Sequence, residues 1–447
     1  MSLARAPRTW SDGVVMSLLA IGALAVRLIP LAFGIESTDI ALYRQQAMPV
    51  MQMQNVYTVT HNVFPYTPVS MFYPALCLRL SGTLGVPFHV VIKLFAILAD
   101  VGIVLALFGL GARLVPRRTA IASAALYASS PASILVSSFH GNIMPFVVLL
   151  ILAAYLLFRQ DPEGNLTVAG LLLGLAVGWR SFPILLLPFF LASIDGRANK
   201  VRFAAWAIVP VMLSMAPFAW ADAPSMVREM LTYSGWGIHH GPFGVLRGLH
   251  LLSIGSITWA NPPAWTPWVT ASKFVFLALY GIAVLLSKRL GLLNGILVTF
   301  FLFDVVYAGV ASQYLIWALP FLLLAERRAM FWAYQLAAAY ALIVFYWIFF
   351  PDILFGALGL PGVGGVALLG HYVVSQVVFS LVGAAGIVVF ATSVATPARA
   401  GAGTRAVVTP ERQRPGILAP LVCLGYLLLF VWEIVFVLGL TPSARGW

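Results

Sequence analysis

The residues that could do chemistry lie in five short polar segments between long apolar runs. A carboxylate such as Asp39, placed where water or a solute reaches it, can take a proton from a hydroxyl group. Arginine and histidine side chains can bind an anion and stabilise negative charge that develops during a reaction. The five segments contain Glu36, Asp39, Tyr43 and Arg44; His140, Gly141 and Asn142; Trp179, Arg180 and Ser181; Asp222, Arg228, Glu229, His239, His240 and Arg247; and Ser312, Gln313 and Tyr314.

Each of these features also has a purely structural interpretation. Asp39 stands at the start of a helical pattern and could cap that helix. Arg180 is typical of an anchor at a membrane interface, or of an ion-pair partner for Asp304. The run His140-Gly141-Asn142 is typical of a tight turn, and Gln313-Tyr314 of an interfacial aromatic belt. These interpretations stay open until the segments are placed in space.

Two further polar residues lie inside an apolar run. Lys93 and Asp100 are seven residues apart, which is two helical turns, so they share a helix face. We prefer a buried ion pair, or separate contacts to neighbouring helices, over a proton relay.

Metal and redox chemistry have little support in the sequence. His239-His240 resembles half of a metal site, but no acid or histidine cluster completes it nearby. The two cysteines, Cys77 and Cys423, lie in apolar runs without metal spacing. We therefore assign no metal ligands.

The composition is that of a membrane protein. Of the 447 residues, 61% are hydrophobic and 9% are charged, and the mean hydropathy is +0.97. A soluble protein carries about 25% charged residues. These values exclude a soluble enzyme with a single membrane anchor, and they exclude a disordered chain.

The apolar runs have the length of membrane-spanning helices, roughly 20 residues each. They predict an all-α polytopic fold of about 13 transmembrane helices. The expected helices are 13–33, 88–112, 118–137, 143–158, 166–179, 181–194, 203–219, 264–287, 290–309, 312–325, 329–350, 368–392 and 416–440.

The charge distribution orients these helices. The segments expected on the cytoplasmic side, including the N-terminus, carry 17 of the 26 Lys and Arg but 6 of the 14 Asp and Glu. Basic residues near helix ends favour the cytoplasmic side. The net charge of +12 therefore reflects topology and requires no nucleic acid partner. With this orientation, the five polar segments all face the outer side.

One apolar segment, 66–84, is not expected to span. If it did, every later helix would invert and place Arg117 and Arg118 outside. Pro65, Pro68 and Pro74 indicate an irregular path, so we predict an interfacial or re-entrant helix within a long outer loop, 34–87.

Several short motifs, taken in order, resemble a known family. They are Thr38-Asp39-Ile40-Ala41-Leu42-Tyr43, Pro65-Tyr66-Thr67-Pro68, Lys93 with Asp100, Ser137-Ser138-Phe139-His140-Gly141-Asn142, Trp179-Arg180-Ser181-Phe182-Pro183 and Ser312-Gln313-Tyr314. This order is similar to that of the GT-C glycosyltransferases, and most of all to the GPI mannosyltransferase I branch and its prokaryotic relatives. The resemblance covers roughly residues 30–325.

The resemblance implies an inverting transfer of a sugar from a polyprenyl-phosphate donor on the outer face of the membrane. It implies that an acid in the first outer loop, here Asp39, is the general base. A leaving lipid phosphate would need cations, for which the candidates are Arg180, Arg44, His140, His239 and His240. The candidates for contacts with the substrates are Tyr43, Tyr66, Asn142, Trp236, Gln313 and Tyr314.

The sequence departs from the mannosyltransferase branch at Ala41, where that branch has a second acid. The departure argues against a two-carboxylate metal site but leaves the base in place. No cofactor is assigned with certainty, and a divalent metal is disfavoured for this reason.

Two other functions compete with glycosyl transfer. One is a transporter or flippase for a lipid-linked sugar, which would show inverted repeats and charges at the bilayer midplane. The other is a catalytically silent scaffold that holds a partner subunit. The expected partners of the enzyme are the donor, a lipid or glycan acceptor and membrane lipids.

The chain is expected to form a catalytic transmembrane module (1–394) with outer loops at 34–87 and 220–262. A cytoplasmic linker rich in Gly, Pro and Arg (395–415) and a C-terminal transmembrane helix (416–447) follow. The expected location is the bacterial plasma membrane, or the ER membrane in a eukaryote.

Overall fold

The computed structural model describes residues 10–60, 64–232, 251–255, 266–307, 309–350 and 366–392. All the regular elements in these residues are helical. They are α1 (Trp10–Leu31), α2 (Thr38–Met51), α3 (Val56–Val59), α4 (Val69–Leu84), α5 (Phe88–Gly109), η1 (Gly111–Arg113), α6 (Arg117–Ala128), α7 (Pro131–Ile134), η2 (Leu135–His140), α8 (Met144–Gln160), α9 (Leu166–Trp179), η3 (Phe182–Leu186), α10 (Leu187–Ala192), α11 (Arg197–Thr232), α13 (Thr266–Leu285), α14 (Ser287–Val306), η5 (Ser312–Ile316), α15 (Leu319–Leu324), α16 (Arg328–Phe349) and α17 (Val366–Thr392).

The helices confirm an all-α polytopic membrane protein. Within the described ranges, α1, α5, α11, α14, α16 and α17 are long and apolar enough to cross a membrane. The bent pair of α6 with α7 and η2 makes a seventh span if it is counted as one. Five shorter apolar helices accompany them. Together these segments match twelve of the expected helices, and the thirteenth, 416–440, lies outside the described residues.

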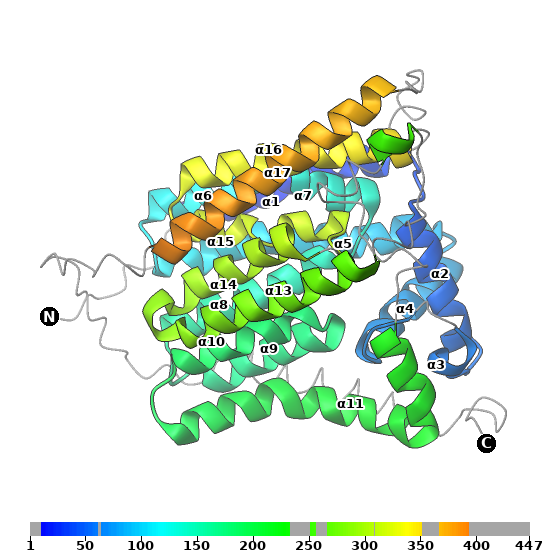
Figure 1. Ribbon diagram of the computed structural model, residues 1–447, viewed down its shortest axis with the longest axis horizontal. Helices are drawn as coiled ribbons and strands as arrows, with labels where there is room; N and C mark the ends of the chain where they lie inside the picture. The colour runs from blue at the N-terminus through cyan, green and yellow to red at the C-terminus, as the bar shows by residue number, and fades with distance from the viewer. Residues whose placement is uncertain are drawn as a thin grey trace, which may run out of the picture.

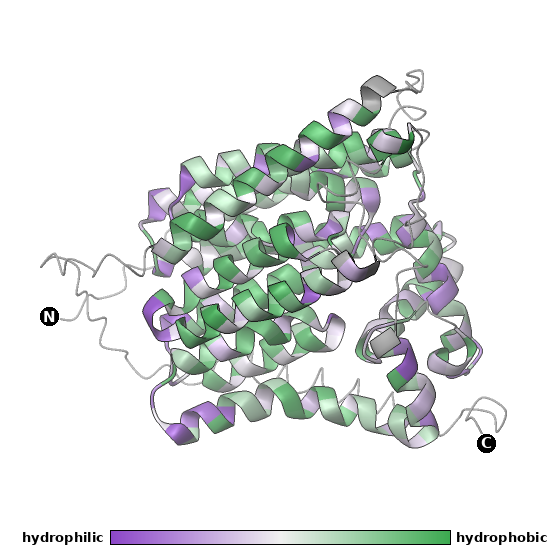
Figure 2. Ribbon diagram, viewed as in Figure 1, coloured by the Kyte–Doolittle hydropathy of each residue, from purple (hydrophilic) through white to green (hydrophobic). Residues whose placement is uncertain are grey.

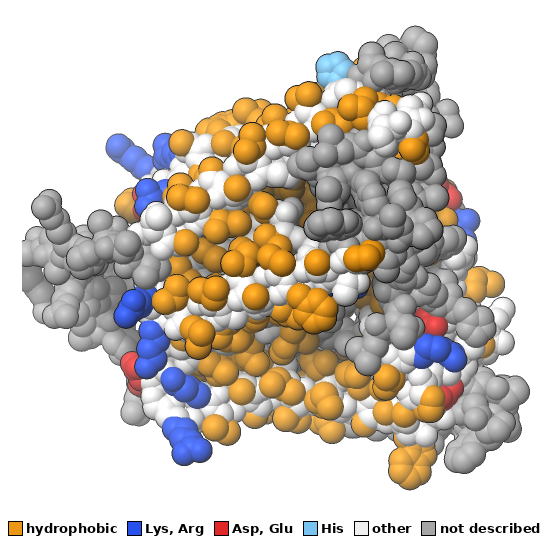
Figure 3. Space-filling model, viewed as in Figure 1, with side chains coloured by type: hydrophobic (Ala, Val, Ile, Leu, Met, Phe, Trp, Pro, Cys, Tyr) orange, Lys and Arg blue, Asp and Glu red, His pale blue; other side chains and the backbone are white. Residues whose placement is uncertain are grey.

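The two ends of the bundle differ in polarity. The long helices run side by side (Figure 1), and apolar side chains cover the middle of the bundle (Figures 2 and 3). Lys and Arg gather at one end (Figure 3), and Arg117, Lys288 and Arg328 lie in the first turns of α6, α14 and α16. The short helices α2, α3 and α4 lie together at the opposite end (Figure 1). This arrangement agrees with the charge pattern of the sequence.

Within the segment 34–87, the described residues form helices α2, α3 and α4, which make a cap at one end of the bundle. Helix α4 packs against α2, α5 and α9. The Tyr73 hydroxyl donates to the Ile92 carbonyl oxygen of α5 at 2.8 Å. Tyr57 of α3 donates to the Tyr66 carbonyl oxygen at 2.7 Å. These bonds fix the cap, so that α2 and the Tyr66 segment keep defined positions against the bundle.

The first part of the expected outer loop 220–262 is helical. Helix α11 continues to Thr232, with a kink at Asp222, where the backbone has φ −162° and ψ 81°. The Asp222 carboxylate accepts a hydrogen bond from the Ser225 backbone N–H at 3.0 Å. Asp222 therefore caps the second part of the helix, and Pro224 falls in its first turn. Residues Trp236, His239 and His240 lie outside the described residues.

Helix α9 approaches α11 through a row of glycines. Gly170, Gly174 and Gly178 are spaced by four residues and share one face. A Cβ atom added at Gly174 would lie 2.7 Å from the Ala207 carbonyl oxygen of α11. Small residues at this spacing allow membrane helices to pack closely. Since Arg180 directly follows α9, this contact also sets the position of Arg180.

We expect Gly174→Ala to destabilise the protein by about 1–3 kcal/mol, because the added methyl group forces two backbones apart. Gly22→Ala is the matched control, since an added Cβ at that helical glycine meets no atom within 4 Å. Thermal unfolding in detergent should show a lower midpoint for Gly174→Ala alone. Equal midpoints for the two variants would contradict the close approach of α9 and α11.

Candidate active site

The site is built around Asp39 in the first turn of α2. Ser37 caps this helix, because its Oγ accepts a hydrogen bond from the Ile40 backbone N–H. The Ser37 hydroxyl also donates to the His140 carbonyl oxygen at 2.6 Å. The alternative that Asp39 is the helix cap is therefore wrong. Its carboxylate is favoured by the positive end of the helix dipole and is available for other contacts.

Two donors from a distant segment bind the same oxygen of Asp39. His140 Nε2 lies 2.8 Å from Asp39 Oδ2, and Asn142 Nδ2 donates to it at 2.5 Å. Since a carboxylate only accepts, the hydrogen of this contact lies on His140 Nε2. No described residue hydrogen bonds to Asp39 Oδ1. The Asp39 side chain is 23% exposed, so solvent reaches part of this carboxyl group.

The local backbone explains why His140 and Asn142 point the same way. Helix η2 is a π-helix that ends at His140, and π-turns often occur at functional sites. Gly141 then takes a left-handed conformation with φ +79°, which glycine adopts without steric cost. The predicted tight turn is thus present, and its two flanking side chains bind Asp39.

Lys93 of α5 holds the backbone of this turn in place. Its side chain is fully buried, and its Nζ donates to the Phe139 carbonyl oxygen at 2.8 Å. A cation is favourable at the carboxyl end of a helix. A Cβ atom at Gly141 would lie 2.7 Å from Lys93 Cγ and 3.1 Å from Ile40 Cδ1. The turn is therefore held between α5 and α2.

Arg180 forms the cationic part of the site. Its guanidinium carbon lies 3.7 Å from the centre of the Tyr66 ring, in a cation–π contact. The Thr67 hydroxyl donates to the Gly178 carbonyl oxygen, which ties the Tyr66 segment to the end of α9. In the described residues, Arg180 makes one hydrogen bond, to the Trp179 carbonyl oxygen at 3.2 Å. A guanidinium has five N–H donors, so most of them remain for an anion.

The charges of Asp39 and Arg180 stabilise each other. Burial by itself raises the pKa of Asp39, but His140, Asn142 and Arg180 outweigh it and lower the pKa below its ordinary value. Burial by itself lowers the pKa of Arg180, but Tyr66, Tyr43, Tyr314 and Asp39 outweigh it and raise the pKa. At neutral pH the site therefore holds a carboxylate beside a guanidinium cation.

Three other residues expected to contact the substrates are Tyr43, Tyr314 and Gln313. Tyr43 is buried on α2, and burial, more than any other cause, raises its pKa. Tyr314 packs against Trp317 and Phe303. Gln313 accepts a hydrogen bond from the Ser312 hydroxyl.

Arg44 points away from this centre. It forms an exposed ion pair with Glu36 at 3.1 Å and lies over the Phe88 ring. Its fixed contacts are thus surface contacts, and the structure does not group it with Arg180.

The expected partners of the buried charges need correction. Asp304 accepts a hydrogen bond from the Tyr334 hydroxyl at 2.7 Å rather than pairing with Arg180. Asp100 pairs with Arg27 at 2.6 Å. Lys93 and Asp100 therefore make separate contacts to other segments, which was one of the two structural alternatives.

One aromatic neighbour of the site has no counterpart in the sequence motifs. The Tyr346 ring of α16 lies 5.6 Å from the His140 ring, and its hydroxyl is buried without a hydrogen bond in the described residues. Apolar residues surround it in the sequence, so no local pattern singles it out. Only the packing of α16 reveals its place.

The donor set does not fit a two-carboxylate metal site. Asp39 supplies one carboxylate, and its Oδ2 is occupied by His140 and Asn142. Within the described part of the chain, no group of three His, Cys, Asp or Glu side chains could hold a metal ion. We derive no step through a metal.

The fold and the site thus define a polytopic membrane protein with an ionised acid and a buried arginine that interact electrostatically. The sequence profile of glycosyltransferase family 87 matches residues 64–306. This is more than half of the chain, and the protein belongs to this family: it is a membrane glycosyltransferase. No match was found among curated proteins. His140, Asn142 and Arg180 lie inside the matched residues, whereas Asp39 precedes them.

We expect Gly141→Ala to lower glycosyl transfer by at least about tenfold, because the added methyl group displaces the turn that carries His140 and Asn142. Gly85→Ala is the matched control. Gly85 has a similar φ of +64°, but an added Cβ there meets no atom within 4 Å. Both variants carry the same backbone strain, so equal activities would show that the turn tolerates displacement.

Proposed function

We propose that this protein transfers mannose from a polyprenyl-phosphate donor to a lipid or glycan acceptor, with inversion at the sugar C1. The observation that carries the proposal is the electrostatic coupling of Asp39, whose Oδ1 accepts no hydrogen bond from the described residues, to the buried Arg180. A glycosyl transfer from a lipid phosphate needs a proton acceptor and a cation for the leaving phosphate. The mannosyl and polyprenyl specificity rests on the motif resemblance to the GPI mannosyltransferase I branch.

The proposed reaction follows from these two groups. The acceptor oxygen attacks C1 of the sugar while Asp39 Oδ1 takes the hydroxyl proton. The bond between C1 and the phosphate oxygen breaks, and its electron pair leaves with the phosphate. Arg180 stabilises the charge that develops there through charge-assisted hydrogen bonds. The lowered pKa of Asp39 keeps it ionised, and the hydroxyl proton becomes acidic enough to transfer as the new bond forms.

The other expected residues take supporting roles in this proposal. His140 and Asn142 hold the base, which is a different role from the phosphate contact expected for His140. Tyr66 lies against Arg180, Tyr43 and Tyr314 influence its charge, and all three could line the sugar. Arg44 could reach the phosphate only by leaving Glu36. Apolar surfaces of the spanning helices suit a prenyl chain.

The orientation of the protein is also a proposal. The basic end of the bundle is placed in the cytoplasm, together with the N-terminus, by the preference of Lys and Arg for that side. The cap of α2–α4 and the site then face the periplasm of a bacterium, or the ER lumen of a eukaryote. A transporter would instead place its polar groups near the bilayer midplane.

We expect Asp39→Asn to reduce kcat by about 10²–10⁴-fold, since the amide keeps the shape but cannot accept the proton. The assay uses purified protein with polyprenyl-phosphate mannose and a membrane lipid extract, and then glucose and arabinose donors. Glu36→Gln is the control, because this nearby acid is exposed and binds Arg44 and His89. Full transfer by Asp39→Asn would refute the proposed base. Donor binding without transfer by the wild type would favour the transporter or the scaffold.

Arg180→Gln should weaken the use of the donor by about 10–150-fold in kcat/KM, as expected for loss of a hydrogen bond to a charged group. Arg79→Gln is the control, because Arg79 is an exposed arginine of the same cap. The measurement is the donor concentration dependence of transfer. A normal kcat/KM for Arg180→Gln would remove Arg180 from the phosphate site.

A further inference from the structure

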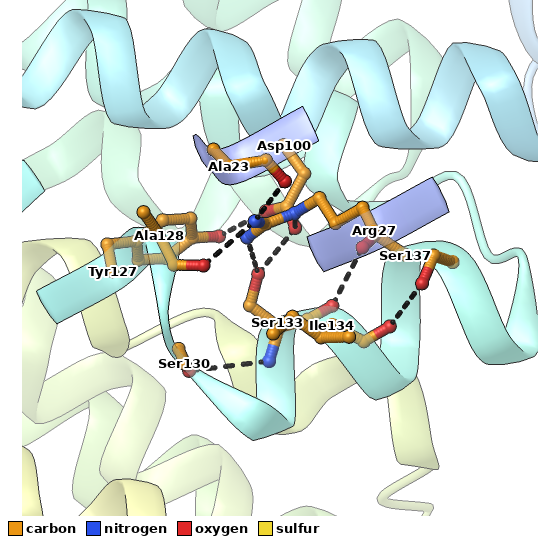
Figure 4. Close-up of polar contacts among 10 residues, drawn as sticks. Ala23, Arg27, Asp100, Tyr127, Ala128, Ser130, Ser133, Ile134 and Ser137 are labelled. Atoms are coloured by element: carbon orange, nitrogen blue, oxygen red, sulfur yellow. Dashed lines mark hydrogen bonds and ion pairs between the residues drawn. The ribbon is translucent and has the colours of Figure 1, made fainter. Parts of the chain in front are cut away.

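A buried ion pair joins four helices at some distance from Asp39. Arg27 of α1 and Asp100 of α5 are both fully buried, and Arg27 Nε lies 2.6 Å from Asp100 Oδ2 (Figure 4). The Tyr127 hydroxyl of α6 donates to Asp100 Oδ1 at 2.7 Å. The Ser133 hydroxyl of α7 donates to Asp100 Oδ2 and accepts from Arg27 Nη2. The pair therefore contacts both helices of the bent span.

The pair also fills the break between α6 and α7. Arg27 Nη1 donates to the Ala128 carbonyl oxygen at 2.9 Å, at the last residue of α6. This carbonyl is among those that a helix end leaves without a partner. The two parts of the span meet at an angle of 47°. Arg27 thus satisfies the Ala128 carbonyl at the end of α6, and both residues bind Ser133 at the start of the next segment, which fixes the direction of α7.

A proton relay does not explain this cluster. The hydrogen-bond partners of Asp100 are Arg27, Tyr127 and Ser133, and none of them leads to Asp39. A buried ion pair inside a membrane is costly, and removal of its charges is often neutral for stability. Stabilisation of the fold therefore does not by itself explain why the chain keeps this ion pair.

The bent span leads directly to the site. Helix η2 continues α7 and ends at His140, seven residues after Ser133, and it packs against both α1 and α5. We propose that Arg27 and Asp100 are positioning residues that hold the bend of this span so that His140 reaches Asp39. The inference rests on the proposed role of Asp39 as the base.

The proposal predicts a change in the pH dependence of the reaction. The titratable groups that face Asp39 are His140 of η2, Arg180 after α9, Tyr43 of α2 and Tyr346 of α16. If His140 moves away from Asp39, the effect of burial outweighs the remaining contacts of the carboxylate, and the pKa of Asp39 rises. A base must be ionised, so the acidic limb of kcat then moves to higher pH.

The test variant is Arg27→Met with Asp100→Asn, which removes both charges together and keeps partners for Tyr127 and Ser133. Ser133→Ala is a milder second variant that removes the bridging hydroxyl. Ser137→Ala is the matched control. Ser137 is equally buried one turn later, and within the described part of the chain its hydroxyl hydrogen bonds only to the Ser133 carbonyl oxygen.

Three measurements are made on the intact protein: thermal unfolding, hydrogen–deuterium exchange of residues 135–142, and kcat against pH. We expect the double variant to unfold near the wild-type temperature, to exchange faster in 135–142, and to lose at least about tenfold in kcat with its acidic limb at higher pH. Ser133→Ala should change in the same direction by less, and Ser137→Ala should match the wild type.

The possible results test the positioning role of Arg27 and Asp100 separately from the role of Asp39 as the base. Unchanged exchange in 135–142 overturns the inference, whatever the activity. Faster exchange with a normal kcat and a normal acidic limb also overturns it. An active Asp39→Asn protein in the same series refutes the base itself, whereas an inactive one beside a fully active double variant refutes only the positioning role. A double variant that unfolds early leaves the decision to Ser133→Ala against Ser137→Ala.

Discussion

A single carboxylate oxygen that accepts two hydrogen bonds connects the cap to the bundle. Asp39 stands at the start of α2, and its donors His140 and Asn142 follow the bent span about one hundred residues later in the chain. Neither segment could keep this geometry alone, because a short helix and a glycine turn are both easily displaced. The other buried polar contacts around the site hold one or the other of these two segments.

These supporting contacts come from inside the membrane-spanning part. Lys93 holds the carbonyl group at the end of η2, and the Arg27–Asp100 pair holds the bend that precedes it. Glycines of α9 bring Arg180 close to the same place. Charged residues are costly inside a bilayer, and small residues let membrane helices approach closely, so their concentration behind one site is informative. The bundle acts here as a rigid support for a small polar site at its end.

The electrostatics of the site also depend on this support. Asp39 is largely surrounded by protein, which by itself favours the protonated acid, yet its donors and Arg180 keep it ionised. Arg180 in turn stays charged beside aromatic rings, with few hydrogen bonds of its own. Such a pair is suited to a reaction in which a proton is accepted and a phosphate leaves.

The sequence by itself determined the class of protein and most of the helices. Apolar runs have a fixed length in a bilayer, and the bias of Lys and Arg follows from topology, so twelve helical segments could be placed from composition and period alone. The sequence also singled out Asp39, His140, Asn142 and Arg180. Only the tertiary structure decided that His140 binds Asp39, that Arg44 turns to Glu36 and that Asp100 pairs with Arg27. Tyr346 could not be found, because contacts between distant helices leave no local pattern in the chain.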